Sequence, residues 1–164
     1  MLQLMQGTAI ALAAVLALRN PSFESEPGYC ERFARQVFES VYPEHAEVTV
    51  NFLASARSSA TAFIDTKYCV VDRVGGMILP TESERLVQAG DYLYKCIRTS
   101  GVSGHVGIAF HQPTADGGSI ICVAENSSYH ENPDATGNVN GAKGYRNLDD
   151  FGPYEVLVRF DKQV

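Results

Sequence analysis

The chain has 164 residues, of which 45% are hydrophobic and 20% are charged, proportions typical of one soluble globular domain with a substantial core. Its 13 basic and 19 acidic residues give a formal net charge of −6, and no basic run occurs along it. Nucleic-acid binding requires clustered positive charge to neutralise phosphates, and an anionic membrane surface attracts the same charge. We therefore expect neither partner.

The N-terminal segment 1–19 is the most apolar part of the chain. Its alanine-rich run 9–18 resembles the core of a signal peptide, but no Lys or Arg precedes it and Arg19-Asn20-Pro21 is a poor cleavage site. Polar residues also interrupt the segment too often for a membrane span. We expect a core helix that ends at Asn20-Pro21, with no clear signal peptide and no membrane span. An export or attachment segment is the alternative.

The next predicted element is an amphipathic helix from Cys30 to Val41. A loop precedes it, because the prolines at 21 and 27 and the glycine at 28 interrupt helical structure. Within 30–41, apolar residues recur at helical spacing on one face and charged residues occupy the other. Cys30 lies in the first turn and on the apolar face.

The start of a helix is a position that suits a reactive thiol. The unpaired backbone N–H groups and the positive end of the helix dipole favour a negative charge there. With a cation nearby, such a site lowers the pKa of a thiol from about 8.5 into a range of about 3.5–7.5. The alternative for Cys30 is a small buried hydrophobic residue, which most free cysteines are.

Hydrophobic periodicity predicts the remaining elements. Helices are expected over residues 51–65 and 81–89, the second opened by a capping box at 81–84. Strands are expected over 68–74, 91–97, 104–111, 119–126 and 154–160, and an Asn- and Gly-rich loop over 131–144. Because helices come first and hairpin-length connections join the later strands, we expect an α+β fold with N-terminal helices packed on an antiparallel β-sheet, in a single domain 1–164.

A histidine begins the predicted strand 104–111. His105 shares one face of this strand with Gly107 and Ala109. The two small residues leave room for another element to approach, such as the helix end that carries Cys30. In isolation, His105 could equally be a strand-end residue near solvent.

The turn at 113–118 would place residues 125–128 opposite His105. Glu125 or Asn126 could there bind the second ring nitrogen and orient the imidazole, as in a nucleophile–base–orienter set. Because neighbouring strand residues point to opposite faces, we expect one of the two to be the direct partner. A hydrogen-bonded turn is the alternative for this pair.

The other cysteines, at 69, 96 and 122, lie in apolar or strand-like runs and are expected in the core. No cysteines or histidines have the spacing of a zinc site, and no glycine-rich phosphate loop follows a strand. We therefore expect neither a metal nor a cofactor.

Four segments, in this order, resemble a known family: 28–35 (Gly-Tyr-Cys-Glu-Arg-Phe-Ala-Arg), 89–94 (Ala-Gly-Asp-Tyr-Leu-Tyr), 104–108 (Gly-His-Val-Gly-Ile) and 123–126 (Val-Ala-Glu-Asn). The series resembles the CHAP family (cysteine, histidine-dependent amidohydrolase/peptidase) and its NlpC-type relatives, the cell-wall cysteine hydrolases of bacteria and phages. The resemblance implies a papain-like α+β core, with a cysteine at a helix start and a histidine on the neighbouring sheet. It also implies cleavage of peptide or amide bonds in peptidoglycan.

By this resemblance, Cys30 is the nucleophile, His105 is the base and Glu125 takes the acidic position of the family. The asparagine of the family usually follows the acidic residue at a short distance, whereas Asn126 is adjacent to it here. The third catalytic residue therefore stays open between Glu125 and Asn126.

Three further residues, Tyr29, Tyr129 and His130, are expected to border the cleft and bind substrate. The predicted activity is that of a peptidoglycan hydrolase, either an endopeptidase or an N-acetylmuramoyl-L-alanine amidase. The chain leaves no room for a wall-binding domain, which favours a virion-associated enzyme or one delivered to the bacterial cell wall with other virion or tail proteins. The alternatives are a non-enzymatic structural or docking module and a papain-like protease that acts on a protein substrate.

Overall fold

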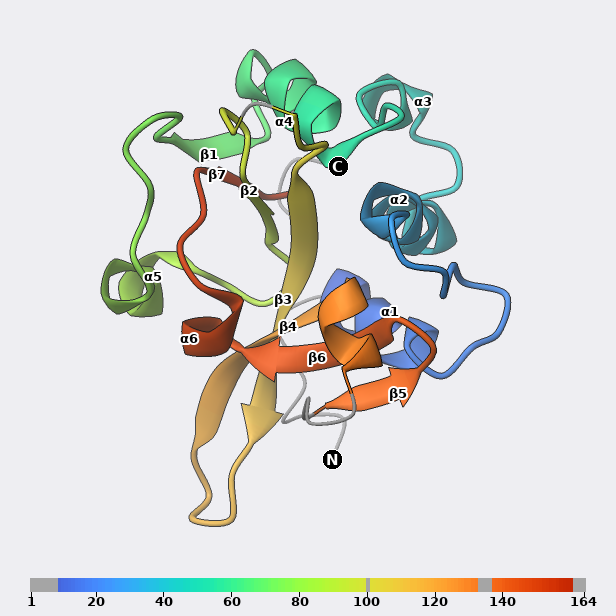
Figure 1. Ribbon diagram of the computed structural model, residues 1–164, viewed down its shortest axis with the longest axis vertical. Helices are drawn as coiled ribbons and strands as arrows, with labels where there is room; N and C mark the ends of the chain where they lie inside the picture. Colours follow the sequence, from blue (N-terminus) through green and yellow to red (C-terminus); the bar gives the residue numbers. More distant parts are fainter. Residues whose placement is uncertain (1–8, 100, 133–136, 161–164) are drawn as a thin grey trace.

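The computed structural model describes residues 9–99, 101–132 and 137–160. Helices flank one antiparallel sheet of seven strands, so the expected α+β class is confirmed (Figure 1). The helices are α1 (Ala9–Ala17), α2 (Cys30–Val41), α3 (Ala46–Thr49), α4 (Ala56–Ile64), α5 (Pro80–Leu86) and α6 (Leu148–Phe151), and Ser128–Glu131 forms a 3₁₀ turn. The strands are β1 (Cys69–Asp72), β2 (Tyr92–Lys95), β3 (His105–Pro113), β4 (Ser119–Asn126), β5 (Asn138–Asn140), β6 (Lys143–Asn147) and β7 (Val156–Val158).

The strands are ordered β1-β7-β2-β3-β4-β6-β5 in the sheet. The hairpin of β3 and β4 has the register that pairs Ile108 with Ala124. The next position along the hairpin places Gly107 of β3 opposite Glu125 of β4. His105, the first residue of β3, is two residues before Gly107. The hairpin therefore brings Glu125 close to the histidine, as the turn at 113–118 predicts.

One face of the sheet carries the larger core, which α1, α2 and α4 cover. Apolar side chains of α2, among them Phe33 and Phe38, are buried in one cluster with the β3 side chains Val106 and Ile108. Aromatic rings fill much of it: the ring centroids of Phe38 and Phe160 are 4.8 Å apart. Burial of this stripe holds α2, and with it Cys30, against the sheet.

The other face carries a second core, which α6 and the segment after α5 cover. In Figure 1, α5 and α6 lie on one side of the long strand β3 and α2 on the other. Gly107 belongs to this second face, where a Cβ atom would lie 2.2 Å from Val123 Cγ1 and 3.0 Å from Phe151. Gly107 therefore lets β4 and α6 approach β3 closely.

Several element boundaries differ from those expected. Residues 51–55 are not helical, because Ser55 caps α4 by accepting a hydrogen bond from the Ser58 N–H. Helix α5 begins after Leu79, whose N–H faces the Glu82 carboxylate, and Pro80 takes its first position. The expected loop 131–144 was wrong, since β5 and the start of β6 lie within it and pair with the sheet.

Helix α1 is the described part of the expected first helix, and Ile10, Ala11 and Ala14 are fully buried in the core. The buried ammonium of Lys143 donates to carbonyls of Ala17 and Asn20 at the end of this helix and of Phe23 beyond it. Lys143 thus satisfies carbonyls that the helix itself leaves unpaired. Within the described ranges, no helix has the length and apolar character needed to cross a membrane.

Candidate functional site

Cys30 is the first residue of α2, as the sequence predicts, and it is half-buried. Its Sγ lies 4.0 Å from the carbonyl oxygen of Gly104, immediately before β3. Burial would raise the pKa of the thiol, but the hydrogen bond and the charge of His105 bring this pKa below its ordinary value. Backbone hydrogen bonds from Val106 and Glu31 act in the same direction.

His105 begins β3, and its ring lies on the second face of the sheet. The centroid of its ring is 5.8 Å from that of Phe151 in α6. The expectation that Gly107 and Ala109 make room for the helix bearing Cys30 was wrong, because both small residues face α6 and β4. Cys30 instead reaches the imidazole from beyond the start of the strand.

The imidazole binds Glu125 through one nitrogen. His105 Nε2 lies 2.6 Å from Glu125 Oε1, and the side chain of Glu125 is fully buried. Because Nε2 faces the carboxylate, Nδ1 is the nitrogen that remains for Cys30. Burial alone would lower the pKa of His105, but its hydrogen bonds to Cys30 and Glu125 raise that pKa to about 9.

Asn126 does not take part in this arrangement. Its side chain points to the other face, as alternation along β4 requires, and its Nδ2 donates to the carbonyl of Glu26 at 2.7 Å. Glu26 belongs to the loop that leads to Cys30. Between the two candidates for orienting His105, the geometry therefore favours Glu125, while Asn126 anchors the loop before α2.

Arg146 and His130 complete the surroundings of Glu125. Arg146 Nη2 donates to Oε1 at 3.3 Å, and Arg146 Nε lies 2.7 Å from Oε2 as an ion pair. His130 Nε2 lies 2.9 Å from Oε2. Burial would raise the pKa of the Glu125 carboxyl, but hydrogen bonds from the two histidines and the charge of Arg146 hold it well below its usual range.

Sequence reasoning missed Arg146 because the loop expected over 131–144 includes the start of β6, and no element was expected over the residues that follow it. The pattern Lys-Gly-Tyr-Arg-Asn at 143–147 has no strong alternation that would predict a strand. Its pairing partner β4 was predicted, but nothing local in the sequence connects the two strands.

His130 also differs from its expected place in the cleft. Its side chain has no exposed surface, and its ring packs so closely on Gly144 that a Cβ there would lie 2.6 Å from ring atoms. A buried ring beneath Glu125 cannot touch a substrate in this structure, so the expectation that it binds one is corrected. In the site, His130 binds the Glu125 carboxylate and helps to keep the pKa of this carboxyl low.

The two tyrosines expected at the cleft keep exposed surface. Tyr29 precedes Cys30 and is 43% exposed, with the guanidinium of Arg32 over its ring. Tyr129 is half-buried and stacks on Arg146, whose guanidinium carbon is 4.2 Å from the ring centroid. Both positions remain compatible with substrate contact.

Glu31 is a second buried carboxyl, next to Cys30 in sequence and 3% exposed. Burial raises the pKa of this carboxyl well above its usual range, although hydrogen bonds from Ser59 and Tyr94 oppose the shift. Burial therefore favours the neutral form of this carboxyl beside the thiol.

The other cysteines lack the features of a nucleophile. All are free thiols. Burial raises the pKa of Cys122 to about 11, and burial together with nearby aspartates raises that of Cys69. Cys96 follows β2 in a left-handed conformation, with φ of 64°. Cys30 is the thiol with a lowered pKa among the residues described.

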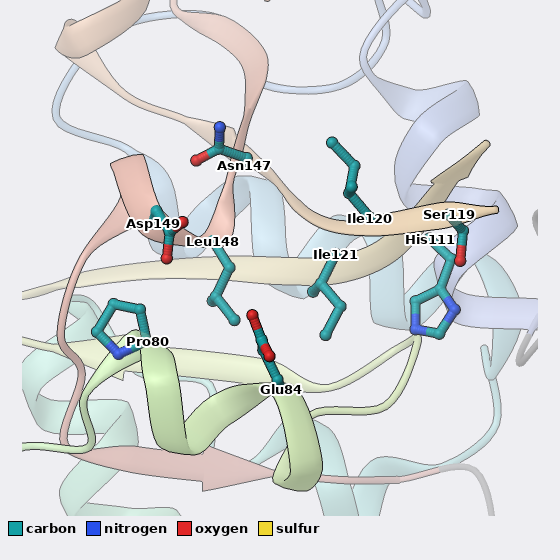
Figure 2. A pocket seen from close by; sticks show the side chains of 9 residues that line it. All are labelled: Pro80, Glu84, His111, Ser119, Ile120, Ile121, Asn147, Leu148 and Asp149. Atoms are coloured by element: carbon teal, nitrogen blue, oxygen red, sulfur yellow. The ribbon is translucent and has the colours of Figure 1, made fainter. Parts of the chain in front are cut away.

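A cavity of about 510 Å³ lies apart from this site, between α5, α6 and the far end of the β3–β4 hairpin. Figure 2 shows the carboxylates of Glu84 and Asp149 and the ring of His111 around it, with apolar side chains between them. His111 is six residues along β3 from His105, so this cavity does not contain the thiol. Where the structure describes the chain, no group of His, Cys, Asp and Glu side chains could hold a metal ion.

The site thus contains a thiol at a helix start, an imidazole that is hydrogen-bonded to this thiol, and a buried carboxylate that is hydrogen-bonded to the other ring nitrogen. Such a set can generate a thiolate and transfer protons to and from a reacting group. Comparison of the chain with protein-family models, curated proteins and solved structures found no match in any of the three.

Proposed function

We propose that the protein is a papain-like cysteine hydrolase that cleaves a peptide or amide bond of peptidoglycan. The observation that carries the proposal is the chain of contacts from the Cys30 thiol to the His105 imidazole and on to the Glu125 carboxylate. The substrate class rests on the resemblance of the Cys30, Gly90-Asp91, His105 and Glu125 segments to CHAP and NlpC-type enzymes.

The reaction begins with the thiolate of Cys30 and the imidazolium of His105. Sγ attacks the carbonyl carbon and forms a C–S bond. The C–N bond then breaks, and the leaving nitrogen takes the proton of the imidazolium. In this reaction the backbone N–H of Cys30, in the first turn of α2, donates to the oxyanion, a contribution of about 2.7–4 kcal/mol for one such donor.

Water completes the cycle. It gives a proton to neutral His105 while its oxygen attacks the thioester carbon. The C–S bond breaks, the acid product leaves and the thiolate–imidazolium pair is restored. Glu125 stabilises the imidazolium in both halves and keeps Nδ1 directed at the sulfur. Tyr29 and Tyr129 are the side chains proposed to border the bound substrate.

The test is digestion of purified bacterial cell walls, followed as loss of turbidity. Wild type is expected to clear the suspension and Cys30→Ala to leave it unchanged, while Cys69→Ala, which removes another half-buried thiol, retains activity. Mass spectrometry of the soluble products distinguishes an amidase, which releases intact stem peptides, from an endopeptidase, which cuts within them.

A folded Cys30→Ala protein that clears walls as fast as wild type would show the proposal to be wrong. Cleavage of soluble proteins without loss of turbidity would instead favour a protease with a protein substrate. A non-enzymatic docking module on the same scaffold would be favoured by two results together. Cys30 would not react with iodoacetamide at mildly acidic pH, and neither cell walls nor soluble proteins would be hydrolysed.

A further inference from the structure

Arg146 lies behind the proposed catalytic residues, where the reaction does not require it to touch substrate. Its side chain is 9% exposed, and it contacts both carboxylate oxygens of Glu125. Its Nη1 donates to the carbonyl of Asp150 at 3.3 Å. The rings of Tyr129 and Phe151 lie 4.2 and 5.4 Å from its guanidinium carbon. Five contacts with four residues thus hold this cation in a fixed orientation.

The sheet puts this arginine on the face that carries Glu125. Strand β6 pairs with β4 so that Arg146 is opposite Val123 and Gly144 is opposite Glu125. Cross-strand partners point to the same face, so Arg146 and Glu125 are diagonal neighbours. Gly144 has no side chain, and the ring of His130 occupies the space that a Cβ atom would need there.

The other charged groups around the thiol come from separate elements. Lys95 of β2 is the cross-strand neighbour of His105, and its ammonium donates to the Phe151 carbonyl. Among the described residues, the ion pairs of Glu125 are with His105, His130 and Arg146 and not with Lys95. Burial raises the pKa of Glu31 of α2 and so favours its neutral form. Arg146 is therefore the permanently charged partner in direct contact with the Glu125 carboxylate.

We propose that Arg146 is a positioning residue that keeps Glu125 ionised and directed at His105, and so sets the pH at which Cys30 becomes a thiolate. This inference rests on the proposed function, since it assigns Arg146 a part in preparing the same nucleophile. It adds a fourth member to the set, one that acts through Glu125.

The direction of the effect follows from the charges. Without Arg146, the buried Glu125 carboxylate loses a fixed counter-ion and its pKa rises. Where Glu125 takes up a proton, the imidazolium of His105 loses the negative charge that stabilises it, and the thiolate loses its stable partner. Removal of a nearby positive charge also disfavours the thiolate directly. Both effects move the deprotonation of Cys30 to higher pH.

The experiment measures the rate of Cys30 alkylation by iodoacetamide between about pH 4 and 9, with mass spectrometry to resolve the four cysteines. Arg146→Gln retains a hydrogen-bond donor without the charge, and Arg146→Met has a similar length for packing between the two rings. Arg146→Lys retains the charge. Arg159→Gln is the matched control, since Arg159 forms an equivalent pair with buried Asp91, both contacts at 2.8 Å, away from the thiol.

We expect the midpoint of alkylation to rise by about one pH unit in the two neutral variants, which lowers the rate about tenfold at pH values below the midpoint. Arg146→Lys is expected to recover most of the shift, and Arg159→Gln to lower thermal stability without moving the midpoint. A purely structural arginine would lower stability and leave the midpoint in place.

Three results would overturn the inference. One is a wild-type midpoint in both neutral variants. Another is an equal shift in Arg159→Gln. The third is failure of both neutral variants to fold while Arg159→Gln folds, which would assign Arg146 to stability alone. A wild-type midpoint near the ordinary thiol value of about 8.5 would instead contradict the proposed function itself.

Discussion

Cys30 and His105 belong to opposite layers of the molecule and meet only where β3 begins. The helix of Cys30 packs on one face of the sheet, and the ring of His105 lies on the other face near Phe151. The sulfur reaches the strand at Gly104, whose carbonyl is 4.0 Å away. This meeting point leaves the imidazole free to bind Glu125 through its far nitrogen, within the second layer.

The first prediction concerns the pH dependence of hydrolysis. Because the pKa of His105 is raised to about 9 and that of Cys30 is lowered, the thiolate–imidazolium pair exists between the two values. Activity should rise with deprotonation of the thiol and fall again at about pH 9, where the imidazolium loses its proton. The measurement is the initial rate of wall clearance across this range. Activity that keeps rising beyond pH 10 would contradict the assignment of His105 as the acid.

The second prediction separates Glu125 from its neighbour. In Glu125→Gln, the imidazolium loses its buried counter-charge, so its pKa falls and the basic limb of the activity profile moves to lower pH. The rate constant kcat should fall about 100-fold with little change in KM, because the contact acts on proton transfer and not on substrate binding.

Asn126→Ala is the control for that variant. It removes the hydrogen bond to the Glu26 carbonyl, which costs about 1 kcal/mol of stability, and leaves the basic limb in place. Should Asn126→Ala move the basic limb and Glu125→Gln leave it unchanged, the asparagine would be the residue that orients the imidazole.

The third prediction concerns Glu31 and stability. Its pKa is raised on folding, so the native state holds a proton that the unfolded state loses above about pH 4.3. The stability that this proton provides is complete below that pH and is lost as pH rises towards the folded pKa. Glu31→Gln, a neutral mimic, should therefore be close to wild type at pH 4 and more stable at pH 7, by about 1.4 kcal/mol for each unit of raised pKa.

Chemical denaturation at the two pH values measures this difference. Glu39→Gln is a suitable control, because the Glu39 side chain is 42% exposed and pairs with Arg35 at the surface. A Glu31→Gln protein that is equally destabilised at both pH values would mean that the native carboxyl is ionised.

The fourth prediction concerns Lys143. Replacement by Met leaves the carbonyls of Ala17, Asn20 and Phe23 without their shared donor in a buried place. We expect a loss of about 3 kcal/mol, equivalent to a fall in Tm of about 6–12 °C for a chain of this size. Thermal unfolding by circular dichroism measures it, and Lys67→Met, at an exposed lysine, should stay within about 0.5 kcal/mol of wild type. Equal melting temperatures for the two variants would contradict the structural role of Lys143.

Local patterns were sufficient for the two halves of the candidate site. The helix 30–41 was predicted at its observed bounds because its apolar face repeats at helical spacing without interruption. The β3–β4 hairpin was predicted because alternation and a turn-forming segment define it within about twenty residues. The helix expected over 51–65 began too early, because Ser55 ends the preceding turn by capping α4.

Long-range pairing decided the rest. Strand β6 contributes Arg146, yet its own residues lack the alternation of a strand, and it is stable only because β4 and β5 flank it. His130 was expected to border the cleft and touch substrate, because it follows the strand 119–126 in a loop, but the absence of a side chain at Gly144 admits its ring to the interior. Contacts of this kind depend on residues that spacing along the chain does not relate.

The sequence by itself determined that Cys30 starts an amphipathic helix and that one hairpin joins His105 to Glu125, because both follow from periodicity and a short turn. Only the tertiary structure decided which face of the sheet each side chain occupies, which of Glu125 and Asn126 binds the imidazole, and that Arg146 and His130 enclose the carboxylate. The physical reason is that helix and hairpin formation depend on near neighbours, whereas the burial of a charge depends on every element that packs around it.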